Sequence, residues 1–490
     1  MPTATIRPTL FCLHALGMSR DEFALVSTEL ADEFDVVALD LPGFGEASTA
    51  DGVTIDDTVR GVTRRIRDHG ATRWLLVGHS MGGKIASIVA ARTLAGRGGL
   101  FGLAGVVLLA ASPPSPEPMD DERRQTMIDW AAPGRLDHAA ARDFVDGNVG
   151  APLPEALDGQ AVADVQRSSA EAWTAWLERS SREDWSAEVG TLDLPALIVA
   201  GGADGDLGPD AQRELNGRVY PRAHHLVLDG AGHLLPLERP AEVVTALRRF
   251  WHDDAGRSPE IAADFSRTIA SSRTASNTRG IMARRAVADD PRYTPRALTA
   301  AQLDTLRVIA DRVVPQDDPE HAIDLAARVD AQLAAGVGDG WRNADLPPDA
   351  EAYARGLDQL ADFGSLTDAQ RDERLTAIVA GEYSGGAAAV DDAGGAADGA
   401  AGAAADVATG GGAAASTDQE ARRLTPAQLT AWFEDCRVDL VKQWLAHPST
   451  MQRIGFDGFA NGRAGRGLQG FTRFGAGQRE GWEPAMEVTR

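Results

Sequence analysis

Short apolar runs alternate with helical patterns through the first half of the chain. The runs are rich in Val, Leu and Ile, and stretches with apolar residues at helical spacing separate most of them. Six of these runs read as strands: Thr9–His14, Val36–Asp40, Trp74–Gly78, Gly105–Ala110, Ala196–Ala200 and His225–Asp229. This alternation is typical of a parallel sheet covered by helices on both faces. The sequence therefore predicts an α/β domain over residues 1–253.

One interval interrupts the alternation of strands and helices. Between Pro113 and Leu194 no run reads as a strand, and helical pieces carry a series of large aromatic residues. These are Trp130, Phe144, Trp173, Trp176 and Trp185. We interpret this interval, about 113–194, as a helical cap inserted between two strands. Its aromatic residues either line an apolar pocket or form the core of the cap.

The second half of the chain has a different pattern. Residues 254–295 are polar with little periodicity, which is typical of a linker. Residues 296–490 are expected to form a mainly α-helical domain, because apolar residues recur at helical spacing from Leu298 onward. Residues 384–416 are almost pure Ala, Gly and Asp and predict a disordered loop. Residues 454–484, rich in Gly, Phe and Arg, are expected to be extended and docked, or else loose.

Length, charge and cysteine content narrow the class of protein. At 490 residues the chain is expected to hold two or three domains. The net charge is −24 and neither half is basic, which argues against a nucleic acid or an anionic membrane surface as partner. No apolar stretch has the length of a membrane span, and Met1–Pro8 lacks a secretory pattern. Two isolated cysteines, Cys12 and Cys436, build no disulfide framework, so we expect a cytoplasmic protein.

The strand over Trp74–Gly78 runs into a candidate nucleophile. It ends in Gly78-His79-Ser80-Met81-Gly82, and an alanine-rich helical pattern follows at once. This is the strand, serine, helix order of the G-x-S-x-G turn, in which glycines leave room for a strained serine. The helix that begins at Met81 directs its free N–H groups at the same spot. The alternative is a chance Gly/Ser turn, and the partners described next argue against it.

A serine nucleophile needs a base and an acid, and the chain offers both in the expected order. Histidine suits the base because its pKa lies near neutral pH, and a carboxylate fixes its tautomer. Asp204 follows the strand at 196–200 in a Gly-rich turn, and His233 follows the next strand after Gly-Ala-Gly. Asp206 and Asp210 are rival acids, and we prefer Asp204 because it comes first after the strand.

An oxyanion hole for this serine requires two N–H donors. We assign one to Met81, directly after the nucleophile, and the other to Leu16, in the loop after the first strand. His14, in the same loop, is interpreted as a loop-packing residue.

Five motifs make residues 1–253 resemble the α/β-hydrolase fold superfamily. They are His14-Ala-Leu-Gly17, Asp40-Leu-Pro-Gly-Phe-Gly45, Gly78-His-Ser-Met-Gly-Gly83, Gly201-Gly-Ala-Asp204 and Gly230-Ala-Gly-His233. The resemblance implies a mainly parallel sheet with an inserted helical cap. Similar turns occur in carboxylesterases, C–C bond hydrolases, lactonases and cofactor-free haloperoxidases, so the reaction is less specified than the fold. Two departures are Ala15 in place of the usual glycine and a chain that starts directly at the first motif strand.

Three segments of the second half also carry a resemblance. They are the apolar stripe from Leu298, Val314-Pro-Gln-Asp-Asp-Pro319, and Trp444-Leu-Ala-His-Pro448 followed by Gly455-Phe-Asp-Gly-Phe459. Over roughly 295–485 the chain resembles the small subunit (subunit 3) family of gluconate 2-dehydrogenase. The resemblance implies a helical partner of a flavin-bearing sugar oxidoreductase of the GMC type. FAD is then expected on that partner, and no cofactor is expected in this chain.

Together these features predict a serine hydrolase for a small ester or lactone, fused to an accessory module. The nucleophile, acid and base are Ser80, Asp204 and His233. A lactone fits an oxidoreductase partner, because sugar oxidation at C1 yields one. The alternative is a structural subunit of a dehydrogenase complex whose hydrolase domain is secondary or inactive. The cap carries no readable motif, so the substrate stays open.

Overall fold

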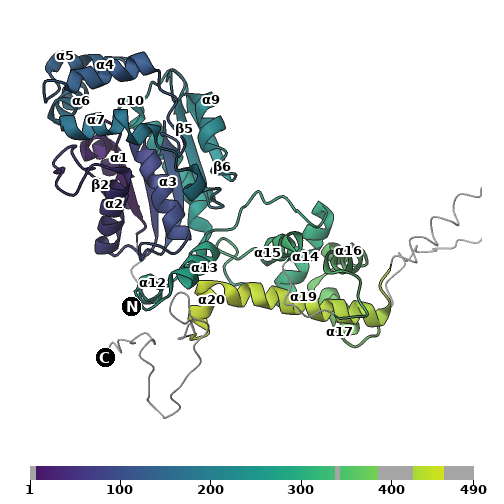
Figure 1. The fold of residues 1–490 in the computed structure, drawn as a ribbon. Helices are drawn as coiled ribbons and strands as arrows, with labels where there is room; N and C mark the ends of the chain where they lie inside the picture. The colour runs from purple at the N-terminus through teal and green to yellow at the C-terminus, as the bar shows by residue number, and fades with distance from the viewer. Residues whose placement is uncertain (1–6, 337–342, 384–422, 457–490) are drawn as a thin grey trace, which may run out of the picture. The chain divides into compact units, whose positions relative to one another are not determined.

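The computed structural model describes residues 7–336, 343–383 and 423–456 (Figure 1). They divide into two compact units. One contains the residues up to Pro291 together with the segment from His447, and the other spans Arg292–Ala446. Each unit has its own apolar core, so each is described by itself.

One parallel sheet forms the centre of the first unit. Its strands run in the order β2-β1-β3-β4-β5-β6. Their bounds are Thr9–Leu13 (β1), Asp35–Leu39 (β2), Trp74–His79 (β3), Leu103–Leu109 (β4), Ala196–Gly201 (β5) and Ala223–Leu228 (β6). Every residue of the four central strands is buried, which explains why these strands read as continuous apolar runs. The predicted α/β fold is confirmed.

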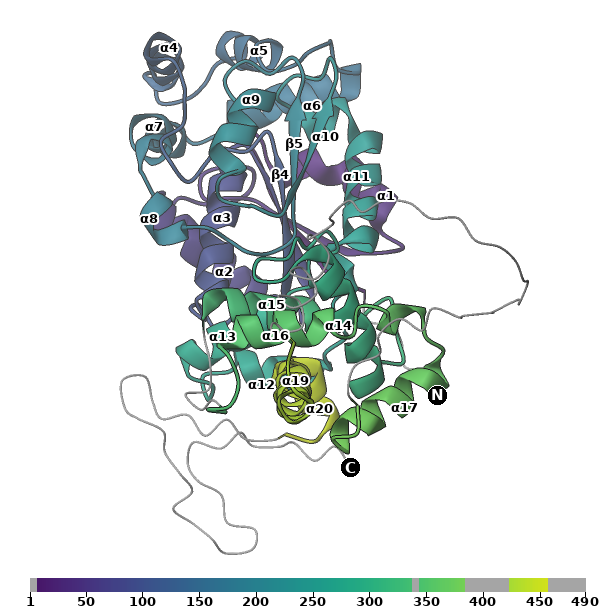
Figure 2. The ribbon, with the colours of Figure 1, turned by 90° about the vertical axis from the view of Figure 1, so that its right-hand side faces the viewer.

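Helices cover both faces of this sheet (Figure 2). Helices α2 (Ile55–His69) and α3 (Met81–Leu94) lie on one face, and α1 (Ala24–Leu30) and α11 (Pro240–Asp253) lie on the other. Alternate residues of β3 serve the two cores, because side chains of a strand point to opposite faces. Together the two layers hold the carboxyl ends of the strands in fixed positions.

The helical cap that the sequence predicts lies between β4 and β5 and covers the carboxyl ends of the strands (Figure 1). Its helices are α4 (Asp121–Ala131), α5 (His138–Asp146), α6 (Glu155–Arg167), α7 (Ala170–Glu178), the 3₁₀ turn η2 (Ser180–Arg182) and α8 (Ser186–Val189). Short elements near the cap are η1 (Arg20–Phe23), α9 (Pro209–Ala211), the π-helical turn η3 (Gln212–Asn216) and α10 (Leu235–Glu238).

The segment predicted as a linker, 254–295, is structured instead. After a short turn, η4 (Ala255–Arg257), it contains α12 (Ala263–Ala270) and α13 (Ser276–Ala286), and α13 packs against α3 and against α20 (Pro448–Arg453). The buried Arg279 guanidinium holds α13 in place by donating to the carbonyls of Gly96 at 2.8 Å and Ile269 at 3.0 Å. An arginine that holds a helix by hydrogen bonds to backbone carbonyls adds nothing to the apolar periodicity of the sequence. The sequence analysis therefore did not predict these helices.

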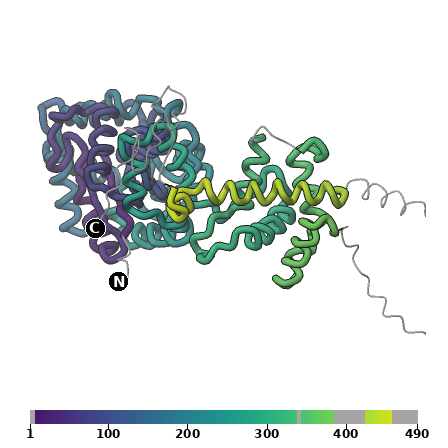
Figure 3. Tube along the Cα trace, turned by 90° about the horizontal axis from the view of Figure 1, so that it is seen from below, coloured from purple at the N-terminus to yellow at the C-terminus, as the bar shows by residue number. Residues whose placement is uncertain are grey.

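Helices form the second unit, as predicted. They are α14 (Ala300–Val313), α15 (Leu325–Ala335), α16 (Asp349–Asp358), the turn η5 (Phe363–Ser365), α17 (Asp368–Val379) and α19 (Pro426–Ala446). The long helix α19, yellow in Figure 3, contacts α14, α15, α16 and α17. Trp432 on α19 is fully buried and packs against Tyr353 and the bare backbone of Gly356.

Two predictions for the second half fall outside the described residues. They are the disordered loop over 384–416 and nearly all of the extended tail over 454–484. Within the described residues, no helix has both the length and the hydropathy that crossing a bilayer requires.

Candidate active site

Ser80 occupies the tight turn between β3 and α3. Its backbone lies in the left-handed region, with φ of 49° and ψ of −118°. Such a conformation costs a non-glycine residue on the order of 1–3 kcal/mol and persists only where the surroundings impose it. Here the Ser80 N–H donates to the carbonyl of Leu109 at 3.0 Å, and its carbonyl accepts from Gly83 at 2.8 Å and Ser112 at 2.9 Å. These bonds fix Ser80 at the carboxyl edge of the sheet.

The glycines around Ser80 are required by close backbone contacts. A Cβ on Gly82 would lie 2.2 Å from the carbonyl oxygen of Leu13, and a Cβ on Gly78 would lie 2.6 Å from the carbonyl oxygen of Gly82. Neither neighbour is a flexible side chain, so a larger residue would displace the main chain. The expected reason for glycine on both sides of the serine therefore agrees with the packing.

His233 and Asp204 lie together at the ends of β6 and β5. His233 Nδ1 is 2.7 Å from Asp204 Oδ2, and Asp204 Oδ1 accepts from the N–H of Leu207 at 3.4 Å. Burial acts to raise the pKa of Asp204, but the charge and hydrogen bond of His233 lower it below its ordinary value. An ionised Asp204 accepts the Nδ1 hydrogen, which leaves His233 Nε2 as the basic nitrogen.

The rival acids lie elsewhere. Asp206 accepts a hydrogen bond from Arg123 of the cap at 2.8 Å. Asp210 is exposed and pairs with Arg213 at 3.1 Å. Of the three candidate acids, only Asp204 contacts His233 among the described residues.

Ser80 and His233 line one cavity between the sheet and the cap. Among the described residues no hydrogen bond joins Ser80 Oγ to His233 Nε2. Catalytic hydrogen bonds are often long before substrate binds and shorten in the bound complex. Two of the predicted cap aromatics, Phe144 and Trp176, line the same cavity, whereas Trp173 is fully buried in the cap core. Phe144 and Trp176 thus line the cavity, as one interpretation of the cap aromatics predicts, whereas Trp173 belongs to the core of the cap, as the other predicts.

Two backbone N–H groups are available beside Ser80. Met81 begins α3, where the first N–H groups of a helix have no intrahelical acceptor. Leu16 lines the cavity from the loop after β1. Within the part of the chain that the structure describes, neither N–H donates a hydrogen bond. Neither N–H group is engaged by a described residue, and their role as oxyanion donors stays a prediction.

A buried His–Glu pair beneath the site was not predicted. His79 Nδ1 lies 3.1 Å from both carboxylate oxygens of Glu22, and His79 Nε2 lies 2.8 Å from the carbonyl oxygen of His233. Both ring nitrogens of His79 thus face an oxygen acceptor. Glu22 also accepts from the N–H of Ala15 at 3.3 Å. One pair therefore holds both the oxyanion loop and the main chain of the base.

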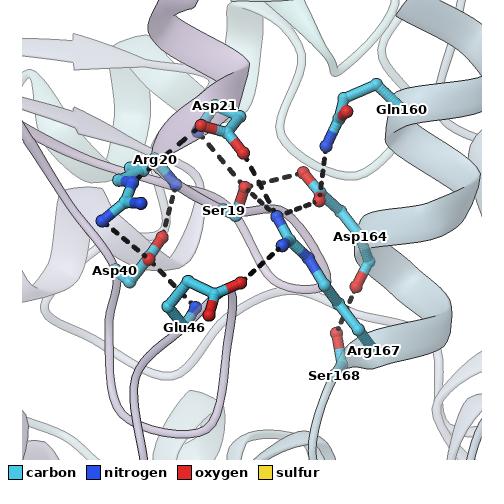
Figure 4. Close-up of polar contacts among 9 residues, drawn as sticks. All are labelled: Ser19, Arg20, Asp21, Asp40, Glu46, Gln160, Asp164, Arg167 and Ser168. Carbon is cyan, nitrogen blue, oxygen red and sulfur yellow. Dashed lines mark hydrogen bonds and ion pairs between the residues drawn. The ribbon is translucent and has the colours of Figure 1, made fainter.

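A polar network ties that loop to the cap (Figure 4). Ser19 donates to the buried carboxylate of Asp164 on α6 at 2.8 Å. Arg167, one turn further along α6, bonds to Ser19 at 3.0 Å, Asp21 at 3.3 Å and Glu46 at 3.2 Å. The cap is thereby fixed against the segment that presents the Leu16 N–H.

A buried lysine connects the helix of the nucleophile to the cap. Lys84 on α3 is fully buried, and its ammonium donates to the carbonyls of Glu183 at 2.9 Å, Ser180 at 3.3 Å and Ser181 at 3.4 Å. Burial lowers its pKa to about 8, although nearby carboxylates act in the opposite direction. The loop around η2 is therefore held over α3 by a cation.

Three other polar residues of the cavity were also missed. Glu117, Arg123 and Asn148 line it from the cap side. Asn148 accepts the backbone N–H of His233 at 2.8 Å through its carbonyl, and its side-chain oxygen accepts from Arg123 at 3.2 Å. None lies in a recognisable motif: Glu117 stands in a proline-rich segment, and the others follow no periodicity that marks them. Only the fold brings them to Ser80.

Comparisons with known proteins agree with this fold. The sequence profile of the alpha/beta hydrolase family matches residues 10–246. A 2-succinyl-6-hydroxy-2,4-cyclohexadiene-1-carboxylate synthase of Serratia proteamaculans (strain 568) is 28% identical over 254 residues, which are 50% of this chain and 93% of that protein. A pimeloyl-[acyl-carrier protein] methyl ester esterase of Sodalis glossinidius (strain morsitans) is 32% identical over 111 residues, 23% of this chain and 39% of that protein.

Among solved structures, the enol-lactonase from Burkholderia xenovorans LB400 is similar with 21% identity and a TM-score of 0.44. That similarity covers 50% of this chain and 92% of the enol-lactonase.

Proposed function

The N-terminal half of this chain belongs to the alpha/beta hydrolase family, and on that premise we propose that it is a serine hydrolase for a small ester or lactone. The observation that carries the proposal is the 2.7 Å contact between His233 Nδ1 and Asp204, in a cavity that also contains the strained Ser80. This set suits acyl transfer, because it joins a nucleophile, an oriented base and free N–H donors.

In the proposed reaction Ser80 Oγ attacks the carbonyl carbon while His233 Nε2 takes its proton. Asp204 stays ionised and stabilises the imidazolium that forms. The N–H groups of Leu16 and Met81 bind the oxyanion. Loss of one such donor typically lowers kcat by a factor on the order of 10²–10³. His233 then protonates the leaving oxygen, and an acyl-Ser80 ester remains. Water, deprotonated by His233, cleaves this ester and releases the acid, so the cycle needs no cofactor.

The relatives and the expected partner both bear on the choice of substrate. A relative whose name refers to a methyl ester esterase supports ester chemistry. A lactone is also the product that sugar oxidation at C1 would supply.

For the second half of the chain, residues 296–490, we propose a binding or scaffolding role, as the resemblance to the gluconate 2-dehydrogenase small subunit implies. The partner would then be a flavoprotein dehydrogenase subunit that carries FAD. An alternative follows, in which the chain acts chiefly as a subunit of that complex. We also propose a cytoplasmic location, because Cys12 and Cys436 are separate, buried and free. Co-purification of a yellow, FAD-bearing protein with the full chain would support the partner, and a colourless, single-component preparation would contradict it.

A fluorophosphonate probe tests the hydrolase proposal. We expect the wild-type chain to be labelled and Ser80→Ala to lose both labelling and hydrolysis of p-nitrophenyl esters and sugar lactones. Removal of a catalytic serine typically costs about 10⁶ in kcat. Ser186→Ala, at an exposed cap position, is the matched control and should be labelled normally. Absence of labelling in the wild type would contradict the proposal and favour the alternative.

A further inference from the structure

Glu117 brings a carboxyl group into the cavity that contains Ser80 and His233. It lies in the loop between β4 and α4, and only 8% of the residue is exposed. The main chain of Glu117 is fixed, because its N–H donates to the carbonyl of Ser181 at 2.8 Å and its carbonyl accepts from Met119 at 2.8 Å. A buried carboxyl on a fixed main chain has little freedom to turn toward water.

The two oxygens of this carboxyl have different surroundings. Oε2 accepts from the hydroxyl of Ser112 at 2.6 Å, and the N–H of Ser112 in turn donates to the carbonyl of Ser80 at 2.9 Å. Oε1 accepts no hydrogen bond from any described residue, and no cation of the described chain lies within ion-pair distance of the carboxyl. Glu117 is thus braced against the nucleophile turn by one oxygen while the other has no protein partner.

Oε1 has no protein partner, yet it is not one of the fully buried polar atoms that lack one, so it is open to the cavity that Glu117 lines. A purely structural brace would need only Oε2. A ligand in the cavity can hydrogen-bond to Oε1. Free polar atoms with this placement are the ones that give a ligand site its specificity.

The chemistry around Glu117 favours a neutral donor over a cation. Burial raises the pKa of Glu117, against the hydrogen bond from Ser112 and nearby positive charges, so its carboxyl ionises less readily than an exposed one. The guanidinium of Arg123 lines the same cavity and would repel an ammonium group. A hydroxyl group both donates and accepts, so it can pair with this carboxyl in either protonation state.

We propose that Glu117 is a specificity-determining residue that binds a substrate hydroxyl, so that the cavity selects hydroxylated esters and lactones over their unhydroxylated counterparts. The inference rests on the proposed hydrolase function and names its substrate class. The selected hydroxyl lies on the part of the substrate that faces the loop between β4 and the cap.

Paired lactones test this selection. D-Glucono-1,5-lactone and δ-hexanolactone share a six-membered ring and differ in their hydroxyl groups. We expect wild-type kcat/KM to favour the hydroxylated lactone by roughly tenfold to hundredfold, as a buried hydrogen bond to a carboxyl implies. Glu117→Met should lose most of this ratio, because kcat/KM should fall further for the hydroxylated lactone than for δ-hexanolactone. Glu122→Met, the same substitution at an exposed position of α4, should keep the wild-type ratio.

A second variant and a binding measurement keep the inference independent of folding and of Ser80 chemistry. Glu117→Asp keeps a carboxyl group but withdraws it from the cavity by one methylene, so it should also lower the ratio. This variant serves as the test if Glu117→Met does not fold. The matching lactams are not cleaved, and their binding can be followed by calorimetry. Suppose the chain binds the hydroxylated lactam more tightly, this preference depends on Glu117, and neither lactone is hydrolysed. That result would support the inference and contradict the proposed function. Hydrolysis with an unchanged ratio in Glu117→Met or Glu117→Asp would overturn the inference alone.

Discussion

At the scale of single residues, the charge of His233 is set by a few named groups. Burial acts to lower its pKa, but Asp204, through its charge and hydrogen bond, and then the charge of Glu117 raise the pKa above its ordinary value. The proposed base works only when Nε2 is unprotonated. Activity is therefore expected to rise with pH through this raised pKa, so that the acid limb of kcat/KM lies above the pH of an unperturbed histidine.

Replacement of the acid should move this limb. In Asp204→Asn the anionic partner is lost, so the imidazolium is less stable and the acid limb shifts to lower pH. The rate should also fall by about 10⁴, because the tautomer of the base is no longer fixed. The pH profile of p-nitrophenyl ester hydrolysis measures both effects.

Asp206→Asn is the control for this prediction, because Asp206 contacts Arg123 rather than His233. It should retain activity within about tenfold, with an unshifted limb. The reverse result, with Asp206→Asn inactive and Asp204→Asn active, would show that the acid is misassigned.

Single residues also show what sequence alone could predict. Ser80, Asp204 and His233 each follow a recognisable strand, so chain order and small flanking residues identified them. Glu117 has no such signal, since it lies among prolines with no regular element. Its relation to Ser80 arises because β4 and β3 are neighbours in the sheet, which is a property of the fold.

At the scale of elements, the cap is attached to the sheet by polar groups in addition to apolar packing. Asp164 on α6 holds the loop after β1, and Lys84 on α3 holds the loop at η2. The apolar periodicity of α14 was readable because this helix buries one face. Helices α12 and α13 were missed because a buried arginine, Arg279, carries much of their attachment. Polar anchors of this kind leave no mark in a hydropathy pattern.

The Lys84 anchor predicts a pH dependence of stability. Its pKa is about 8 in the folded chain, below the ordinary value of 10.5, so between these values the unfolded chain binds more protons. The free energy of unfolding should therefore gain a contribution as pH rises from 8 to 10.5, and this contribution is lost as pH falls through 8. Lys84→Met lacks this group.

Chemical denaturation of both proteins at several pH values measures the effect. The stability of the wild type relative to Lys84→Met should increase over this interval. Other groups that titrate there are common to both chains and cancel in the difference. A constant or decreasing difference would contradict the prediction.

At the scale of the whole molecule, two cores are built from separate parts of the chain. One core surrounds the sheet, and the other contains the helices of residues 292–446. The sequence predicted this division from the change of apolar period, but it placed the boundary near 295 with a linker before it. The first unit in fact extends to Pro291 and includes the segment from His447. That return of the chain depends on contacts between α13 and α20, which no local pattern predicts.

Separate cores predict separate effects of core mutations. Leu306 is fully buried in the second unit, and Leu306→Ala should cost about 2–5 kcal/mol. Calorimetry should show a lowered transition for that unit, while fluorophosphonate labelling of Ser80 keeps its thermal midpoint. Leu247→Ala, on α11 in the core of the first unit, should have the opposite pattern. A loss of labelling in Leu306→Ala at the same temperature as unfolding would show that the two units unfold together.

The burial of Lys84 has a practical consequence for chemical labelling. The chain has only two lysines, Lys84 and Lys442, and Lys442 is exposed on α19. Because Lys84 is enclosed under the cap, an amine-selective reagent should modify Lys442 alone among the lysines of the folded chain. A fluorophore or photo-crosslinker can thus be attached to the second unit without mutagenesis. The cavity around Ser80 would stay unmodified, so partner capture and hydrolysis can be followed on the same preparation.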